Sequence, residues 1–188
     1  MIEPAESDNA DTTAGTDERS VADRPRRLGL LLTVGGVIFV LDLASKLAVV
    51  ATLSDRPPVR LLGGFVYLTE ARNTGAAFGL AQGMTVVFTM VAAGVIVVIL
   101  RTAPKLRSTG WAWALGLVLG GALGNLVDRI FRSPGIFRGG VVDFISLLDP
   151  AGQVWPIFNV ADSAIVCGGF LGVVMALRGR DFDGTRTH

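Results

Sequence analysis

The chain of 188 residues has a mean hydropathy of +0.55 and a formal net charge of +1. This hydropathy is high for a soluble domain and indicates a membrane protein, while the small net charge and the scattered basic residues argue against nucleic acid as a partner. The single cysteine, Cys167, and the single histidine, His188, exclude a disulfide framework, a zinc site of the usual ligands and a histidine base, unless a second chain contributes.

The N-terminal segment, residues 1–27, is acidic and then basic. Residues 1–23 mix aspartate and glutamate with small polar residues and offer almost nothing to bury, which predicts a disordered acidic tail. Arg24, Arg26 and Arg27 then form a basic flank. An acidic start is unlike a secretory signal, in which a basic segment leads directly into an apolar one.

The first apolar run, Leu28 to about Leu53, exceeds the roughly 20 residues that a bilayer-spanning helix needs. Asp42 and Lys46 interrupt it. They are four residues apart, so they share a helix face and can pair. Two roles remain open for them: a charge pair that carries polar groups to the membrane boundary, or direct contact with a ligand.

The stretch from Ser54 to Leu80 is less apolar, and its alternating segment from Phe65 to Thr69 predicts short strands outside the membrane. Asn73 begins an Asn-Thr-Gly turn followed by small residues. Such a turn lets the backbone approach a ligand closely, and Asn73 offers both a donor and an acceptor.

The second span, about Gly83 to Leu100, carries no charge and indicates scaffold, and the third runs from about Gly110 to Ile130. Small residues recur in the third span at every fourth position, a pattern that lets membrane helices pack closely. They are Ala112, Gly116, Gly120 and Gly124. Asn125, Asp128 and Arg129 follow on one side of the last turns. We expect Asp128 to form a structural ion pair with Arg129.

Two aspartates framed by apolar residues, Asp143 and Asp162, lie on either side of a polar loop before and within the fourth span, about Ile157 to Leu177. A carboxylate beside hydrocarbon is unfavourable by several kcal/mol unless it is paired, hydrated or protonated, so the pair predicts a functional site. Asn159, three residues before Asp162, can orient its carboxylate. Asp149 is expected in a solvated turn and Cys167 as a small buried residue.

Lysine and arginine near the spans favour one side of the membrane, which places both termini, including the short basic tail at residues 178–188, in the cytoplasm. Asp143 and Asp162 then lie near the outer boundary. Two such carboxylates have three uses: a dyad that shares one proton, a magnesium or calcium site, or a proton or ion relay, of which four short spans fit the relay least.

Five motifs occur in the order and setting of the lipoprotein signal peptidase (signal peptidase II) family, across about Leu28 to Leu177. They are Asp42-Leu-Ala-Ser-Lys46, Asn73-Thr-Gly-Ala-Ala-Phe78, Gly124-Asn-Leu-Val-Asp-Arg129, Val141-Val-Asp-Phe-Ile145 and Phe158-Asn-Val-Ala-Asp-Ser163. The sequence therefore resembles a membrane aspartyl endopeptidase that removes signal peptides from prolipoproteins just before the lipid-modified cysteine.

The resemblance implies a largely α-helical membrane protein, with a four-helix bundle at residues 28–177 and a small extracytoplasmic β-sheet, in the bacterial cytoplasmic membrane. It implies that Asp143 and Asp162 are catalytic, without metal or cofactor, and that globomycin inhibits. Its partners would be prolipoproteins bearing diacylglyceryl-cysteine and membrane lipids. The substrate-binding or orienting residues that it implies are Asp42, Lys46, Asn73, Asn125, Arg129 and Asn159. Two alternatives are a metal-dependent lipid phosphatase and a non-enzymatic membrane scaffold.

Overall fold

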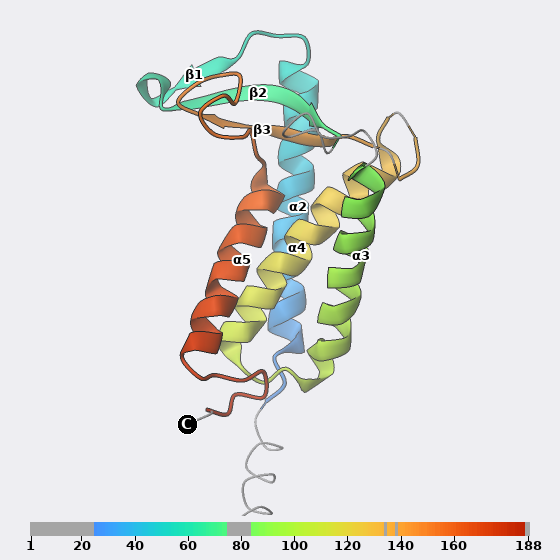
Figure 1. Ribbon diagram of the computed structural model, residues 1–188, viewed down its shortest axis with the longest axis vertical. Coiled ribbons are helices and arrows are strands. Elements are labelled where there is room, and N and C mark those ends of the chain that lie inside the picture. The colour runs from blue at the N-terminus through green and yellow to red at the C-terminus, as the bar shows by residue number, and fades with distance from the viewer. Residues whose placement is uncertain (1–24, 75–83, 134, 138, 187–188) are drawn as a thin grey trace, which may run out of the picture.

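The computed structural model describes residues 25–74, 84–133, 135–137 and 139–186, and in these residues four long helices stand beneath a small antiparallel sheet (Figure 1). The helices are α2 (Leu28–Leu53), α3 (Met84–Thr102), α4 (Thr109–Phe131) and α5 (Val160–Leu177), and the strands are β1 (Val59–Leu61), β2 (Val66–Asn73) and β3 (Val141–Leu147). Two short 3₁₀ turns, η1 (Leu62–Gly64) and η2 (Ala103–Lys105), join them. The expected acidic tail at residues 1–23 lies outside the described residues.

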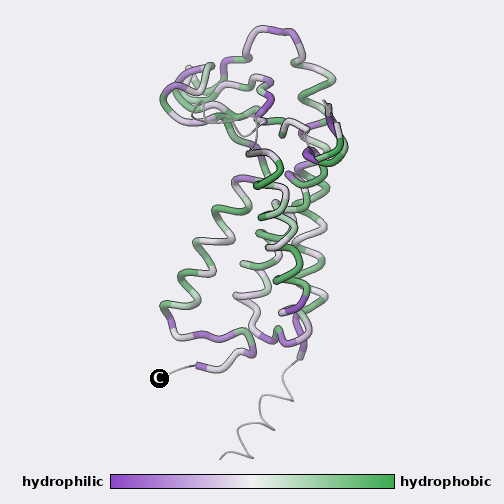
Figure 2. Tube along the Cα trace, turned by 45° about the vertical axis from the view of Figure 1, so that its right-hand side comes forward, coloured by the Kyte–Doolittle hydropathy of each residue, from purple (hydrophilic) through white to green (hydrophobic). Residues whose placement is uncertain are grey.

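All four described long helices are long and apolar enough to cross a membrane. Apolar residues cover them along their length, and hydrophilic residues gather at the two ends of the bundle (Figure 2). Large apolar side chains such as Val98 and Phe170 face outward, 63% and 71% exposed, as helices in contact with lipid require. The predicted four-helix membrane bundle is confirmed. The prediction for Cys167 is wrong: it is exposed on α5, because an apolar run does not show which face of a membrane helix meets lipid.

Helix α4 packs between α2 and α5. A Cβ added at Gly116 would lie 2.8 Å from the Cβ of Val34, and one at Gly120 would lie 2.5 Å from the carbonyl oxygen of Gly35, so both glycines let α4 approach α2. Gly121, on another face, meets Ala161 of α5 in the same way. The small-residue stripe predicted from the sequence is therefore the α2 contact of α4, and it ends at Gly124 against Asp42.

The three described strands pair in the order β1-β2-β3, all antiparallel, at the end of the bundle away from the C-terminus (Figure 1). The register of β2 and β3 slips by one residue: Leu68 faces Ile145, but Ala71 faces Asp143. Without this bulge Glu70 would lie opposite Asp143. Because one extra residue exchanges the two faces of a strand, the bulge puts the small Ala71 and the amide of Asn73 on the aspartate's face instead.

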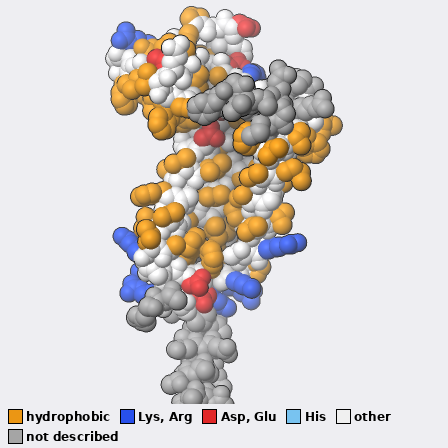
Figure 3. All heavy atoms as spheres, viewed as in Figure 1, with side chains coloured by type: hydrophobic (Ala, Val, Ile, Leu, Met, Phe, Trp, Pro, Cys, Tyr) orange, Lys and Arg blue, Asp and Glu red, His pale blue; other side chains and the backbone are white. Residues whose placement is uncertain are grey.

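The fourth span begins three residues later than expected, because Phe158 exchanges backbone hydrogen bonds with Ile145 of β3 before α5 starts. At the opposite end of the bundle the chain entry, the α3–α4 connection and the C-terminal segment meet. The amide of Arg27 donates to the carbonyl of Leu106, and that of Arg107 to Phe182. Lysine and arginine side chains flank this end (Figure 3).

Candidate active site

Asp143 of β3 and Asp162 of α5 come together on one residue, Asn159. The side-chain amide of Asn159 donates to Asp143 Oδ1 at 2.7 Å, and its backbone N–H donates to Asp162 Oδ2 at 3.2 Å. Asn159 is itself fully buried. The two carboxylates that the sequence places 19 positions apart are thus fixed relative to each other by a single side chain and its own backbone.

Asn159 holds this place because it is the N-cap of α5. Its side-chain oxygen accepts from the backbone N–H of Asp162 at 2.9 Å, which completes a reciprocal capping box. The cap uses the oxygen and leaves the amide nitrogen free to point towards Asp143 and towards Asn125 Oδ1, 3.2 Å away. The Asn159 side chain therefore both caps α5 and orients the aspartates. The sequence spacing predicted its contact with Asp162 but not its contact with Asp143.

Each carboxylate accepts a second N–H from another asparagine. Asn73 donates its amide to Asp143 Oδ2 at 3.0 Å, and Asn125 donates to Asp162 Oδ1 at 2.8 Å. Asp143 is 2% exposed, whereas Asp162 is half-buried. Burial and then the nearby charge of Asp162 raise the pKa of Asp143 from 3.8 to about 7, against the opposing effect of the asparagine hydrogen bonds. Asp143 therefore keeps its proton to a much higher pH than an ordinary aspartate does.

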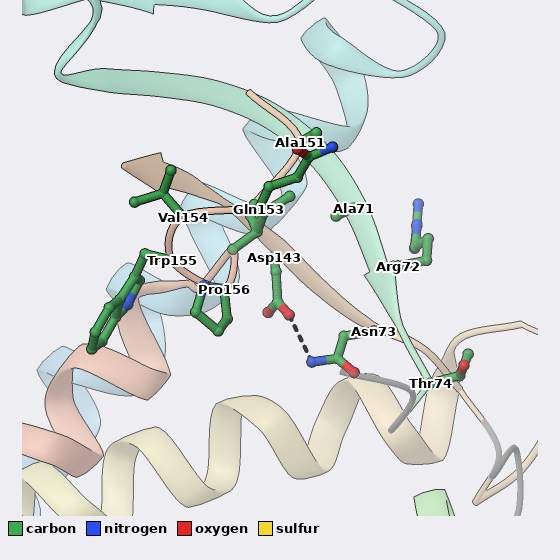
Figure 4. Close-up of a pocket in the computed structure, with 12 residues that line it drawn as sticks. Ala71, Arg72, Asn73, Thr74, Asp143, Ala151, Gln153, Val154, Trp155 and Pro156 are labelled. Carbon is green, nitrogen blue, oxygen red and sulfur yellow. Dashed lines mark hydrogen bonds between the residues drawn. The ribbon is translucent and has the colours of Figure 1, made fainter. Parts of the chain in front are cut away.

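An open cavity of about 550 Å³ lies beside Asp143 (Figure 4). One wall is the end of β2, from Ala71 to Thr74, and the other is the loop from Ala151 to Ile157. The Asp143 carboxyl points towards Asn73 between the two walls. Because the residue opposite Asp143 is only an alanine, the space beside the carboxyl stays open.

A buried charge cluster lies behind the two aspartates. Lys46 Nζ contacts Asp42 Oδ2 at 2.7 Å and Asp128 Oδ2 at 2.9 Å, and it donates to Asn125 Oδ1 at 3.0 Å. Asp42 and Lys46 are 0% exposed and Asp128 is 1% exposed. The pairing of Asp42 with Lys46 is confirmed. Asp128 is ion-paired as expected, but its partners are Lys46 and Arg132 instead of Arg129, since Arg132 lies one helical turn further along the same face.

Arg129 projects towards the aspartates. Its guanidinium donates to the backbone oxygen of Asn125 at 3.1 Å, lies 5.8 Å from the ring centroid of Phe88, and interacts electrostatically with both Asp162 and Asp143. It is the cation of α4 that faces the pair.

Several residues of the site were not singled out from the sequence. They are Ala71, Arg132 and the cavity wall Gln153, Val154 and Trp155. The i,i+4 spacing of Asp128 and Arg132 was a usable signal, but the register that places Ala71 was not. Asp149 accepts three backbone N–H groups within its own turn, as predicted. The part of the Asn73 motif from Gly75 to Phe78 lies outside the described residues.

Among the described residues, no three His, Cys, Asp or Glu side chains are grouped so that they could hold a metal ion. The donors around Asp143 and Asp162 are amide N–H groups. What the arrangement offers chemically is two neighbouring carboxyl groups with different burial, a guanidinium beside them and an open cavity.

Known proteins resemble the chain in sequence and in structure. A family model described as signal peptidase (SPase) II matches residues 34–178. The chain is 50% identical over 179 residues to a lipoprotein signal peptidase of Streptomyces griseus, covering 95% of this chain and 89% of that protein. A lipoprotein signal peptidase of Mycobacterium tuberculosis is 45% identical over 175 residues, with 93% and 84% covered. A solved bacterial membrane enzyme superposes with a TM-score of 0.71 at 26% identity, covering 82% of this chain and 97% of that one.

Proposed function

The chain belongs to the signal peptidase II family, and from this membership we propose that it is an aspartic-type endopeptidase with Asp143 and Asp162 as its catalytic pair. The protein is a multi-pass membrane protease that removes signal peptides from prolipoproteins. Because the chain belongs to this family, the protease function takes the place of the two alternatives that the residues alone left open, a metal-dependent lipid phosphatase and a non-enzymatic scaffold. The observation that carries the proposal is the shared hydrogen bonding of both carboxyls to Asn159.

In the proposed reaction, Asp162 is the general base and Asp143 the general acid. The ionised Asp162 takes a proton from a water molecule, whose oxygen attacks the scissile carbonyl carbon, while the Asp143 proton passes to the carbonyl oxygen. Asp162 then returns its proton to the leaving nitrogen as the C–N bond breaks. A hydroxyl of the tetrahedral intermediate re-protonates Asp143, which restores the starting state. The raised pKa of Asp143 supports this assignment, since the acid must hold a proton near neutral pH.

We propose that the reaction needs no metal ion. Both oxygens of Asp143 and both oxygens of Asp162 accept N–H donors from Asn73, Asn125 and Asn159. A divalent cation bound there would face the positive ends of these N–H dipoles, which repel it, whereas a carboxylate oxygen that accepts one N–H still has room for a proton. The asparagine set therefore suits a pair that exchanges protons.

The other family roles are part of the same proposal. Asn73, at the cavity wall, and Arg129 contact the substrate backbone, whereas Asn125 and Asn159 orient the dyad. Cleavage occurs just before the diacylglyceryl-modified cysteine, and the apolar signal peptide and lipid enter from the bilayer. Inhibition by globomycin is part of the same proposal. The protein lies in the bacterial cytoplasmic membrane with both termini inside, as the basic residues at the C-terminal end of the bundle favour.

The test is cleavage of a purified diacylglyceryl-modified prolipoprotein by the protein in detergent, with and without EDTA. Wild type should cut before the lipidated cysteine in both conditions, and Asp143→Asn and Asp162→Asn should fold but not cut. Asp181→Asn, a matched substitution of an exposed aspartate at the opposite end of the bundle, should cut normally. Cleavage by either catalytic-pair variant, or loss of wild-type cleavage in EDTA, would refute the metal-free dyad.

A further inference from the structure

The backbone next to each aspartate of the dyad is tied to the charge cluster. The residue immediately before Asp162 is Ala161, whose backbone N–H donates to Asp42 Oδ1 at 2.9 Å. The residue immediately before Asp143 is Val142, whose backbone N–H donates to Asp128 Oδ2 at 3.2 Å. Two carboxylates from two different helices thus hold corresponding positions on the two segments that carry the dyad.

Lys46 joins these two carboxylates. Its ammonium group forms ion pairs with Asp42 and Asp128 and donates a hydrogen bond to Asn125. The side chain is completely buried, so the substrate cavity, whose lining does not include Lys46, is not where it acts. Lys46 also helps to fix how Asn125 is turned: its ammonium and the amide of Asn159 both donate to Asn125 Oδ1, which leaves the amide nitrogen of Asn125 to donate to Asp162.

We propose that Lys46 is a positioning residue that sets the spacing of Asp143 and Asp162, through Asp42 to Ala161, through Asp128 to Val142, and through the fixed amide of Asn125. This inference rests on the proposed dyad. It assigns Lys46 no contact with substrate, and it explains why the close-packed stripe of α4 ends in Gly124: a Cβ there would meet the carboxylate of Asp42.

The test measures kcat, KM and the pH dependence of kcat for Lys46→Met with the same prolipoprotein. Loss of the ammonium leaves Asp42 and Asp128 facing each other, so the two aspartate segments move apart. Displacement of reacting groups by about 1 Å lowers rates about a hundredfold. We therefore expect kcat to fall by about that factor, with KM little changed.

The pH profile gives a readout that a merely structural role would not move. The charged groups that face Asp143 are Asp162 from α5, Lys46 from α2 and Arg129 from α4. Removing the Lys46 charge raises the pKa of Asp143 further, so the alkaline limb of kcat should lie at higher pH than in wild type. A change in the amount of folded protein would lower the whole profile without shifting it.

A second variant and a packing control complete the design. Asp42→Asn has one acceptor oxygen in place of two, so it loses either the Ala161 or the Lys46 contact, and its kcat should also fall. Gly116→Ala crowds Val34 and Leu31 in the same helix pair without touching the cluster, so its kcat per folded molecule and its pH limb should match wild type.

The outcomes separate the inference from the proposed function. If Asp143→Asn or Asp162→Asn cuts, the dyad itself is wrong. Suppose that Asp143→Asn and Asp162→Asn are inactive. If Lys46→Met and Asp42→Asn then keep the wild-type kcat and the wild-type alkaline limb of the pH profile, the positioning role of Lys46 is wrong. It is also wrong if these two variants lose activity only in proportion to the loss of folded protein. If Lys46→Met does not fold, Asp42→Asn decides between these results.

Discussion

Replacing Asp143 with asparagine should stabilise the protein at alkaline pH while abolishing cleavage. The pKa of Asp143 is about 7 in the fold against 3.8 for an ordinary aspartate, because burial and the charge of Asp162 oppose ionisation. A group whose folded pKa is raised supports stability fully below the unfolded pKa and loses that support as pH rises through the folded pKa. Asparagine does not ionise, so Asp143→Asn avoids this loss.

The magnitude follows from the two pKa values. At about 1.36 kcal/mol for each pKa unit, ionising Asp143 in the fold lowers the free energy of unfolding by about 4 kcal/mol above pH 8. About 1 kcal/mol of this is already lost at pH 4.5, so the advantage of Asp143→Asn should grow by about 3 kcal/mol between pH 4.5 and 8.5. The variant's amide nitrogen faces an N–H from Asn73 or Asn159, which costs about 1 kcal/mol at every pH and does not affect the growth.

Thermal unfolding in detergent at a series of pH values measures this growth. For a chain of this size, about 3 kcal/mol corresponds to a gain in the Tm difference of roughly 6 to 12 °C. Asp149→Asn is the control, because backbone N–H groups of its own turn, that of Val154 foremost, hold the pKa of Asp149 below its ordinary value. Its stabilising effect is lost only as pH falls below about 4, so Asp149→Asn should lower Tm by a constant amount over the same range.

A Tm difference between Asp143→Asn and wild type that stays constant from pH 4.5 to 8.5 would refute the reasoning. It would mean that Asp143 ionises as easily in the fold as in the unfolded chain, and that it is not the protonated member of the pair.

Three further predictions concern activity and packing. The wild-type kcat should fall as pH rises through about 7, where Asp143 loses its proton, and a rate that keeps rising above pH 8 would contradict its role as the acid. Asn159→Ser should keep the α5 cap, with a stability within about 1 kcal/mol of wild type by thermal unfolding, but its kcat should fall roughly a hundredfold. Asn159→Ala should lose both the cap and the activity. If Asn159→Ser and wild type have equal kcat, the side-chain amide of Asn159 is dispensable. Gly124→Ala should destabilise the bundle by about 1 to 3 kcal/mol and lower kcat, because its Cβ meets Asp42. Gly36→Ala, whose Cβ meets nothing, should neither destabilise the bundle nor lower kcat.

The spans and their packing could be predicted because they depend on one-dimensional patterns. Hydropathy located four helices, the i,i+4 rule paired Asp42 with Lys46, and the small-residue stripe ending at Gly124 marked the face of α4 that meets α2. Each of these signals lies within a single helix, so no knowledge of the fold was needed to interpret it.

The strand that carries Asp143 and the full set of cluster contacts could not be predicted in the same way. The segment from Val141 to Leu147 is buried on both faces, so it lacks the alternation that identifies a half-buried strand. The second partner of Lys46, Asp128, depends on how α2 and α4 are docked. The bulge that aligns Ala71 with Asp143 depends on one extra residue in β2, for which the sequence carries no distinct signal.

The charge balance of the site favours a single proton on the proposed pair of Asp143 and Asp162. In the buried cluster, Asp42 and Asp128 are balanced by Lys46 and Arg132, so it contributes no net charge. Outside this balanced cluster, the positive charge of Arg129 acts on both Asp143 and Asp162. One ionised aspartate makes the whole site neutral, whereas two would leave an uncompensated negative charge beside hydrocarbon, which is unfavourable by several kcal/mol. The acid form of Asp143 is thus the state that the surrounding charges favour, and it is the state from which the proposed reaction starts.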